Sequence, residues 1–137
     1  MSLKNNIRIG QIFKMNRIFT MEDVVKFANL SGDKNPIHLD EKVSEQFIFK
    51  KPICHGMLVS SLFSNLIASN FALSIYLNQT LTFKKPVYLN EEIEASVEIT
   101  DLKKRVLYLK TLVNKRNINN IFDETAIEGN AVVMLNL

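Results

Sequence analysis

The fold is decided by residues 56–71, which read GMLVSSLFSNLIASNF. Large apolar side chains recur there at helical spacing and cover most of the circumference of the helix that they predict: Met57, Leu58, Leu62, Phe63, Leu66, Ile67 and Phe71. A helix that is apolar nearly all round is buried on nearly all sides. The stretch is interrupted by serine and asparagine and is shorter than the roughly 20 residues of a membrane-spanning helix. We therefore expect a helix buried in protein, and no membrane association.

Four segments after this helix are typical of β-strands, at residues 73–83, 92–101, 105–115 and 125–135. In the second, apolar and polar residues alternate, as in an antiparallel strand with one buried face. Residues 117–120 indicate a loose hairpin. One buried helix followed by four long strands predicts an α+β fold, in which a curved antiparallel sheet wraps around a central helix. The open edge of such a sheet predicts a homodimer or a higher homo-oligomer.

The chain ahead of residue 56 predicts one strand and two helices. Residues 11–19 alternate between polar and apolar and predict the strand. Thr20 then caps a helix that has an acidic first turn and that Gly32 ends. A short second helix is expected over residues 40–47. The loop at residues 33–38 therefore lies in a helical overhang, at the end of the first helix.

This loop holds two titratable side chains, in the string Ser31-Gly32-Asp33-Lys34-Asn35-Pro36-Ile37-His38. Pro36 fixes its own φ and keeps Asn35 out of the helical region, so the loop is bent and fairly rigid. Asp33 and His38 can then face a single water molecule, which suits adding water to a substrate or removing it. The same residues are also ordinary turn chemistry, because Asp and Asn bond to nearby backbone and Pro starts turns. The loop alone leaves both interpretations open.

Further strings accompany this loop, and the set comprises Phe27, Leu30-Ser31-Gly32-Asp33-x-Asn35-Pro36-Ile37-His38, Ser44, His55-Gly56-Met57 and Phe83-x-x-Pro86-Val87-Tyr88. In them the chain resembles the MaoC-like hot-dog hydratases, also called the (R)-specific enoyl-CoA hydratases. The resemblance implies one hot-dog domain over residues 1–137, in agreement with the helix and strand pattern, and a catalytic pair of Asp33 and His38. The family usually has Gly-Asp where this chain has Asn90-Glu91. Asn is the next best residue after Gly for a left-handed turn, so the expected fold is unchanged.

Three more residues are candidates for oxyanion or substrate binding. Gly56 opens the buried helix, where unpaired N–H groups and the helix dipole favour negative charge and a thioester oxygen can approach the backbone. A tight turn would explain the same glycine. Asn35 is expected to brace the loop and is also a candidate substrate contact. His55 is interpreted first as a helix-start residue bonded locally, and second as a substrate contact.

Other residues near these strings have structural interpretations. The large apolar residues of the helix are expected in the core, with the wall of an acyl tunnel as the alternative: Met57, Phe63 and Phe71. Residues 83–87 are taken as a structural feature at the end of a strand. Lys84 and Lys85 flank that strand and are expected to be solvated, with contact to coenzyme A phosphates as the alternative.

Composition narrows the class of protein. A hydrophobic content of 47% and a charged content of 23% are typical of a globular protein of 137 residues. The net charge is +3, but no basic stripe with interleaved aromatics indicates nucleic-acid binding, and residues 103–105 predict a solvated turn. The single Cys54 excludes an internal disulfide, fits a cytoplasmic setting and is expected to be a small buried residue. Residues 1–6 are polar and predict no signal peptide.

The resemblance implies a hydro-lyase that reversibly hydrates a trans-2-enoyl thioester to an (R)-3-hydroxyacyl thioester. The acyl group would be carried by coenzyme A or acyl carrier protein, between which the sequence does not choose. We expect no metal or organic cofactor, because the sequence has neither a Cys/His cluster nor a Gly-rich phosphate loop. Two alternatives are a hot-dog acyl-CoA thioesterase and a non-catalytic acyl-thioester-binding subunit. The thioesterase is disfavoured because hydrolysis does not call for a pair such as Asp33 and His38. The binding subunit is disfavoured because it could lose this pair, whereas the present chain retains both residues.

Overall fold

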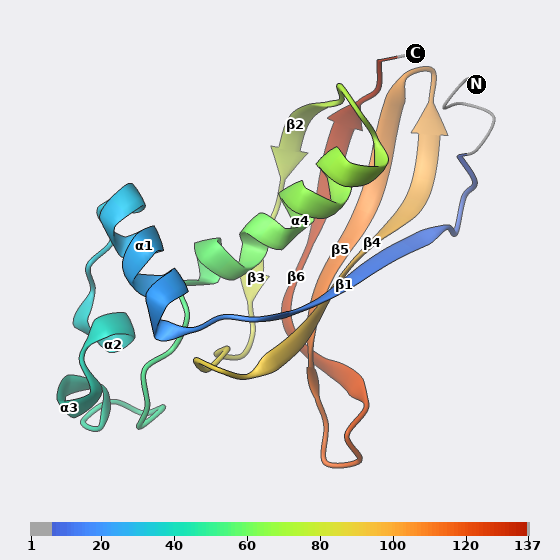
Figure 1. Ribbon diagram of the computed structural model, residues 1–137. Coiled ribbons are helices and arrows are strands. Elements are labelled where there is room, and N and C mark those ends of the chain that lie inside the picture. The colour runs from blue at the N-terminus through green and yellow to red at the C-terminus, as the bar shows by residue number, and fades with distance from the viewer. Residues whose placement is uncertain (1–6, 137) are drawn as a thin grey trace.

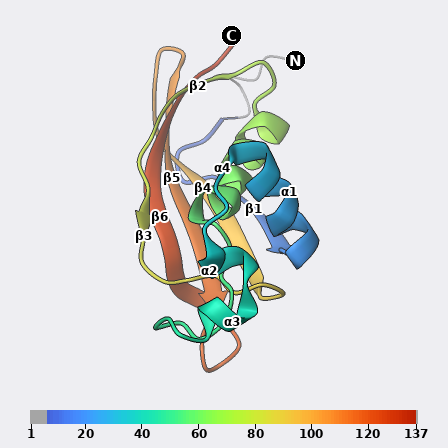
Figure 2. The same ribbon diagram turned by 90° about the vertical axis from the view of Figure 1, so that its left-hand side faces the viewer.

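The computed structural model describes residues 7–136, which form a twisted antiparallel sheet with helices on one side (Figures 1 and 2). The strands lie in the order β1-β4-β5-β6-β2, and β3 also pairs with β6. Their bounds are β1 (Ile12–Ile18), β2 (Ile75–Gln79), β3 (Thr82–Phe83), β4 (Glu92–Lys103), β5 (Val106–Arg116) and β6 (Phe122–Met134). Residues 1–6, for which no signal peptide is predicted, lie outside the described residues.

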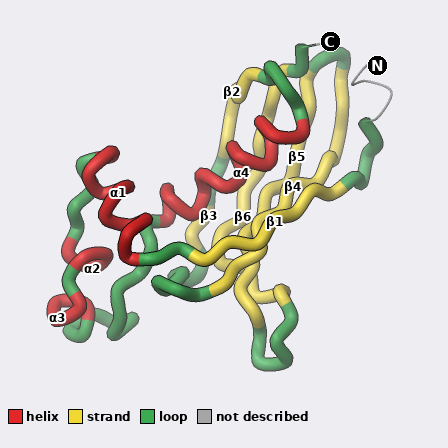
Figure 3. The backbone as a smooth tube through the Cα atoms, in the orientation of Figure 1, coloured by secondary structure: helices red, strands yellow, loops and turns green. Residues whose placement is uncertain are grey.

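Helix α4 (Gly56–Asn70) lies across one face of this sheet, as Figure 3 shows. Its inner residues form the centre of the core: Val59, Leu62, Phe63, Leu66 and Ile67. The predicted α+β arrangement of a sheet around one helix is confirmed. The predicted burial of the helix on nearly all sides is wrong for the described chain, because its outer row of small polar residues is exposed: Ser61, Ser64, Asn65 and Ser69. The sheet covers only one side of the helix.

The sheet presents an apolar face to α4. In β4 the alternation predicted from the sequence is confirmed, and four residues are fully buried against the helix side: Ile93, Ala95, Val97 and Ile99. Burial of this kind is the dominant stabilising contribution in a domain of this size. Within residues 7–136, no helix is long and apolar enough to cross a membrane.

The helical overhang stands beside the sheet and carries three short helices (Figure 1). They are α1 (Met21–Ser31), α2 (Pro36–Leu39) and α3 (Glu41–Ser44). Thr20 and Asp23 form a capping box at the start of α1, and Gly32 ends α1 with a φ of 82°, which favours glycine. The predicted helix over residues 40–47 is wrong in extent. It is shorter than expected and follows α2, because Asn35 caps a new helix with Pro36 at its first position.

Two strands also differ from the prediction. The expected strand over residues 73–83 is divided into β2 and β3, since Thr80 leaves the regular ladder. Its N–H donates to Asn130 O at 2.9 Å, and its hydroxyl accepts from Asn130 N at 2.9 Å. The chain passes so close that a Cβ at Gly129 would overlap Thr80 O. Strand β6 begins at Phe122 and is longer than the predicted 125–135 segment at its start.

The two turns predicted between the later strands are confirmed. Asn117 organises the loose hairpin between β5 and β6, because its side-chain oxygen accepts from the N–H groups of Asn119 and Ile121. Residues 103–105 are exposed and connect β4 to β5, with Lys104 in the left-handed region. Both turns lie away from the overhang, so neither borders the space between the overhang, α4 and β3.

Candidate active site

The loop after α1 is held in a tight conformation by its own polar side chains. Asp33 N donates to Ser31 Oγ at 3.1 Å, and Asn35 N donates to Asp33 Oδ1 at 3.2 Å. Asn35 in turn accepts from Ile37 N at 3.3 Å and so caps α2. The expectation that Asn35 braces the loop is confirmed. Asp33 is exposed, and its carboxylate stands at the edge of the cavity described below.

His38 is placed by α2 and is buried, with 6% of its surface exposed. Its Nδ1–H donates to Ile53 O at 2.6 Å, so the lone pair of the neutral ring lies on Nε2. Burial lowers the pKa of His38 from its usual value, although the hydrogen bond to Ile53 and the charge of Asp33 act in the opposite direction. The ring is therefore suited to accept a proton through Nε2 near neutral pH.

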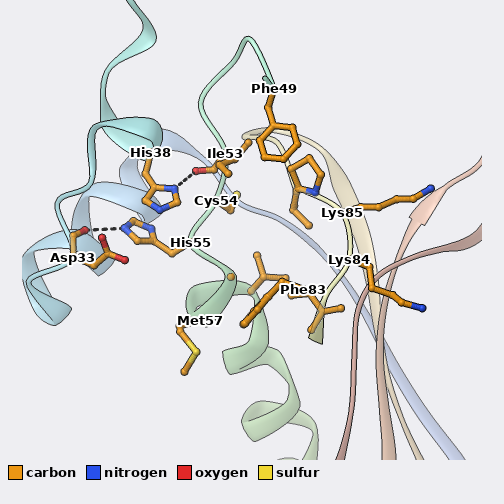
Figure 4. Close-up of a pocket in the computed structure, with 15 residues that line it drawn as sticks. Asp33, His38, Phe49, Ile53, Cys54, His55, Met57, Phe83, Lys84 and Lys85 are labelled. Atoms are coloured by element: carbon orange, nitrogen blue, oxygen red, sulfur yellow. Dashed lines mark hydrogen bonds between the residues drawn. The ribbon is translucent and has the colours of Figure 1, made fainter. Parts of the chain in front are cut away.

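His55 lies directly beneath this ring, although it precedes α4 in the chain (Figure 4). The two imidazoles are stacked, with centroids 3.9 Å apart and planes 28° apart. His55 Nε2–H donates to Asp33 O at 2.9 Å, and Phe27 packs edge-on against the ring at 4.9 Å. His55 is the N-cap of α4, so the prediction of a helix-start residue is confirmed. The predicted local bond is wrong, because the side chain makes no cap bond and contacts a residue 22 positions away in the sequence.

Asp33, His38 and His55 each offer an atom that lies within 4.8 Å of the others. Such a group has the residue types of a metal site. Its geometry suits one poorly, since Nδ1 of His38 and Nε2 of His55 are both engaged by backbone carbonyls. Stacked rings also direct their lone pairs side by side and do not converge them on one ion. The cluster is better suited to proton transfer.

A cavity of about 320 Å³ opens beside these three residues. Figure 4 shows Asp33, His38 and His55 at one end, with Lys84 and Lys85 at the other. Between them lie the start of α4 and the segment after β3. The remaining lining is largely apolar: Phe49, Ile53, Cys54, Met57, Val59, Phe83, Pro86, Val87 and Ile127.

Gly56 lies on the wall of this cavity, at the first position of α4. The amides of residues 56–58 precede the first hydrogen bond of the helix, which Val59 N donates to His55 O. A Cβ at position 56 would lie 2.6 Å from Cδ1 of Phe83, closer than side chains pack. A side chain at position 56 would therefore force the ring of Phe83 to move, a constraint that the sequence did not suggest. Neither the contact with Phe83 nor a tight turn at Gly56 excludes the binding of a ligand oxygen by the amides of residues 56–58.

Sequence reasoning missed part of the cavity wall. For Met57 the favoured prediction of a core residue is wrong, because Met57 is 60% exposed and lines the cavity, as the alternative allowed; Phe63 and Phe71 are buried as predicted. Phe83 was taken as a structural strand end, yet its ring is 51% exposed and stands against Gly56. The only sequence signal for these two was their place beside His55-Gly56 and within Phe83-x-x-Pro86.

Cys54 also lines the cavity but is not equipped as a nucleophile. It is buried as predicted, with 4% exposed, and its thiol donates to Tyr88 O at 3.8 Å. Burial raises the pKa of the Cys54 thiol to about 12, so the reactive thiolate is scarce at neutral pH.

Comparison with known proteins fits this geometry. The MaoC-like domain matches residues 4–120. An (R)-specific enoyl-CoA hydratase from Aeromonas caviae is 38% identical over 134 residues, which cover 95% of this chain and 96% of the relative. A mitochondrial 3-hydroxyacyl-[acyl-carrier-protein] dehydratase from Solanum lycopersicum is 36% identical over 96% of this chain and 79% of its own length.

A solved structure of a hydratase has a similar fold. The (R)-hydratase from A. caviae involved in PHA biosynthesis has a TM-score of 0.87 with 38% identity, and the match covers 94% of this chain and 97% of that chain. The fold and the similar proteins place the chain among the hot-dog hydro-lyases, the enzymes that add or remove water. Within that class, the chain belongs to the MaoC-like domain family.

Proposed function

We propose that this protein reversibly hydrates trans-2-enoyl thioesters to (R)-3-hydroxyacyl thioesters. The observation that supports it most directly is the placement of Asp33 and His38 together at one end of a cavity whose wall includes the first turn of α4. The acyl-CoA substrate is suggested by the name of the A. caviae relative, and the acyl carrier protein by that of the S. lycopersicum relative.

In the proposed mechanism, one water molecule lies between Asp33 and His38. Both groups accept hydrogen bonds, the Asp33 carboxylate through oxygen and His38 through Nε2, so the water directs a lone pair at C3 of the enoyl group. His38 takes the proton as the C–O bond forms, and Asp33 stabilises the resulting imidazolium. The imidazolium then protonates C2 on the same face. General acid–base catalysis of this kind contributes about 10² to 10⁴ in rate.

The charge that develops on the thioester oxygen needs donors that are already in place. We assign this role to the amides at the start of α4, beginning with Gly56, where no side-chain cap occupies the helix end. Asn35 supports the reaction through the loop that it braces. No metal or organic cofactor takes part in this scheme, since every proton transfer in it is made by side chains and water.

The assembly and location of the enzyme are further parts of the proposal. Strand β2 is a sheet edge whose apolar side chains Ile75 and Leu77 are 53% and 51% exposed. Open apolar edges are commonly covered by a second copy, so we expect a homodimer, which light scattering would measure. The single Cys54, free and buried, suits a reducing cytoplasmic compartment.

The test of the function is loss of the conjugated-enoyl absorbance of crotonyl-CoA, with free thiol assayed in parallel. Absorbance loss without thiol release is the expected result. Thiol release would identify a thioesterase instead. Absence of both signals, with longer acyl chains and with acyl carrier protein thioesters, would favour a non-catalytic binding subunit.

A further inference from the structure

The end of the cavity opposite Asp33 and His38 is basic. Lys84 and Lys85 line it, and Figure 4 shows their ammonium groups directed away from the two histidines. Their backbone is fixed on the sheet, because both N–H groups donate to Ala126 O, at 2.7 and 3.2 Å. Phe83, immediately before them, pairs with Ile127 in β6. The two lysines therefore have a defined position relative to the start of α4.

The proposed chemistry orients the substrate in this cavity. C2 and C3 must lie at Asp33 and His38, and the thioester oxygen must lie at the Gly56 amide. An arm that leaves this position along the cavity passes Phe83, whose ring stands against Gly56, and reaches Lys84 and Lys85 at the opposite end. Both coenzyme A and the prosthetic group of acyl carrier protein have phosphate at the far end of this arm.

We propose that Lys84 and Lys85 form a phosphate-binding site for the carrier arm, with Phe83 lining the path of the arm between the thioester and the phosphate. This inference rests on the proposed function, because the reaction sets the direction of the substrate. It chooses, for these lysines, the alternative of phosphate contact over the expectation that they are only solvated.

Each lysine is already paired with a carboxylate on β6. Lys84 Nζ lies 3.2 Å from Glu128 Oε1, and Lys85 Nζ lies 2.8 Å from Glu124 Oε1. The hydrogen bond from Lys85 keeps the pKa of the Glu124 carboxyl below its usual value. Ion pairs as exposed as these are weak, so a phosphate of higher charge can replace the carboxylates. The same carboxylates repel the phosphate as it arrives, and their removal strengthens binding.

The experiment compares two substrates of the same reaction. Crotonyl-CoA has phosphates, and crotonyl-N-acetylcysteamine has none. In the double variant Lys84→Ala/Lys85→Ala, the KM for crotonyl-CoA is expected to rise about tenfold or more, with kcat/KM for the phosphate-free thioester unchanged. Lys14→Ala is the matched control, since Lys14 lies in β1, at the opposite edge of the sheet, and is likewise ion-paired with a glutamate, Glu94. The Lys14→Ala variant should have the wild-type KM and kcat/KM for both substrates.

A change of opposite sign sharpens the test. Glu124→Gln and Glu128→Gln should lower the KM for crotonyl-CoA, because they free the lysines. Crotonyl-phosphopantetheine separates the two sources of phosphate. If its KM also rises in the lysine variant, the site binds the phosphate shared by both carriers. If only that of crotonyl-CoA rises, the site binds the nucleotide phosphates. An unchanged KM for crotonyl-CoA, or an equal loss with crotonyl-N-acetylcysteamine, overturns the inference.

Binding of free coenzyme A, measured by titration calorimetry, keeps this inference separate from the function. If the wild-type protein turns over no thioester, the proposed function fails. Weaker binding of coenzyme A to the lysine variant than to the wild type still supports the phosphate site. Equal binding to both, or none to the wild type, overturns it.

Discussion

The two ends of the cavity are built differently. At the overhang end, His38 and His55 are buried, stacked and hydrogen-bonded to backbone carbonyls. At the sheet end, Phe83, Lys84 and Lys85 are exposed, and the lysines contact surface carboxylates. Fixed, desolvated groups suit a reaction that needs accurate geometry, whereas exposed charges suit the capture of a charged arm. Changes at the overhang end should therefore lower kcat, and changes at the sheet end should raise KM.

The largest effect is expected at the overhang end. Asp33→Asn and His38→Gln should each lower kcat for crotonyl-CoA by about 10² to 10⁴, because Asn lacks the charge that stabilises the imidazolium and Gln cannot take up a proton. Asp40→Asn is the matched control, since Asp40 caps α3 in the same overhang. Steady-state kinetics and thermal unfolding of the three variants measure this. If Asp33→Asn or His38→Gln retains most of the wild-type activity, the substituted residue takes no part in the mechanism.

A second change acts where the two ends meet. Gly56→Ala should lower kcat by about tenfold to a hundredfold, because the new methyl group meets the Phe83 ring and displaces the wall beside the thioester. The double variant Gly56→Ala/Phe83→Ala should recover most of that loss. Kinetics of both variants test the claim. Failure of the second substitution to restore activity would show that the glycine is needed for the ligand and not for the ring.

A third and smaller effect separates the two contacts of His55. His55→Phe keeps a ring against His38 but loses the bond to Asp33 O, whereas His55→Gln keeps a donor and loses the stack. If the bond to Asp33 positions the loop, the Phe variant should lose about tenfold in kcat and the Gln variant less. KM should change little in both. The reverse order would make the stacking on His38 the more important contact.

The smallest effect is in the pH profile. Burial disfavours the imidazolium of His38 and lowers its pKa, so the neutral form that accepts a proton persists to lower pH. The acid limb of kcat/KM should therefore lie below about 6.5, the usual pKa of histidine. As pH falls through the lowered pKa, activity is lost. A limb above that value would mean that the charge of Asp33 outweighs burial.

Much of this structure could be predicted from short-range sequence patterns. The capped helix from Thr20, the alternation in β4 and the Asn35 brace depend on residues within a few positions of one another. The division of the strand at Thr80 could not be predicted, because it depends on Asn130, 50 residues away. The extent of α4 was correct while its exposed side was not, since the pattern does not reveal that the sheet covers only one face.

The candidate site shows the same division. The loop string identifies Asp33 and His38, but the contact of His55 with Asp33 O joins two segments that only the fold brings together. Met57 and Phe83 were assigned to core and strand end because apolar residues are usually buried there. Their place on the wall follows from the approach of Phe83 in β3 to the start of α4, two segments that no local pattern brings together.

Hydration of crotonyl-CoA in D₂O tests the central claim most directly, because Asp33 and His38 lie at one end of the cavity and, in the proposed mechanism, address one face of the substrate. NMR coupling constants of the 3-hydroxybutyryl product report the relative placement of the new C–D and C–O bonds. The account predicts syn addition, with deuterium at C2 on the same face as the hydroxyl at C3. Anti addition would require a proton donor on the opposite wall and would contradict a mechanism carried by this pair.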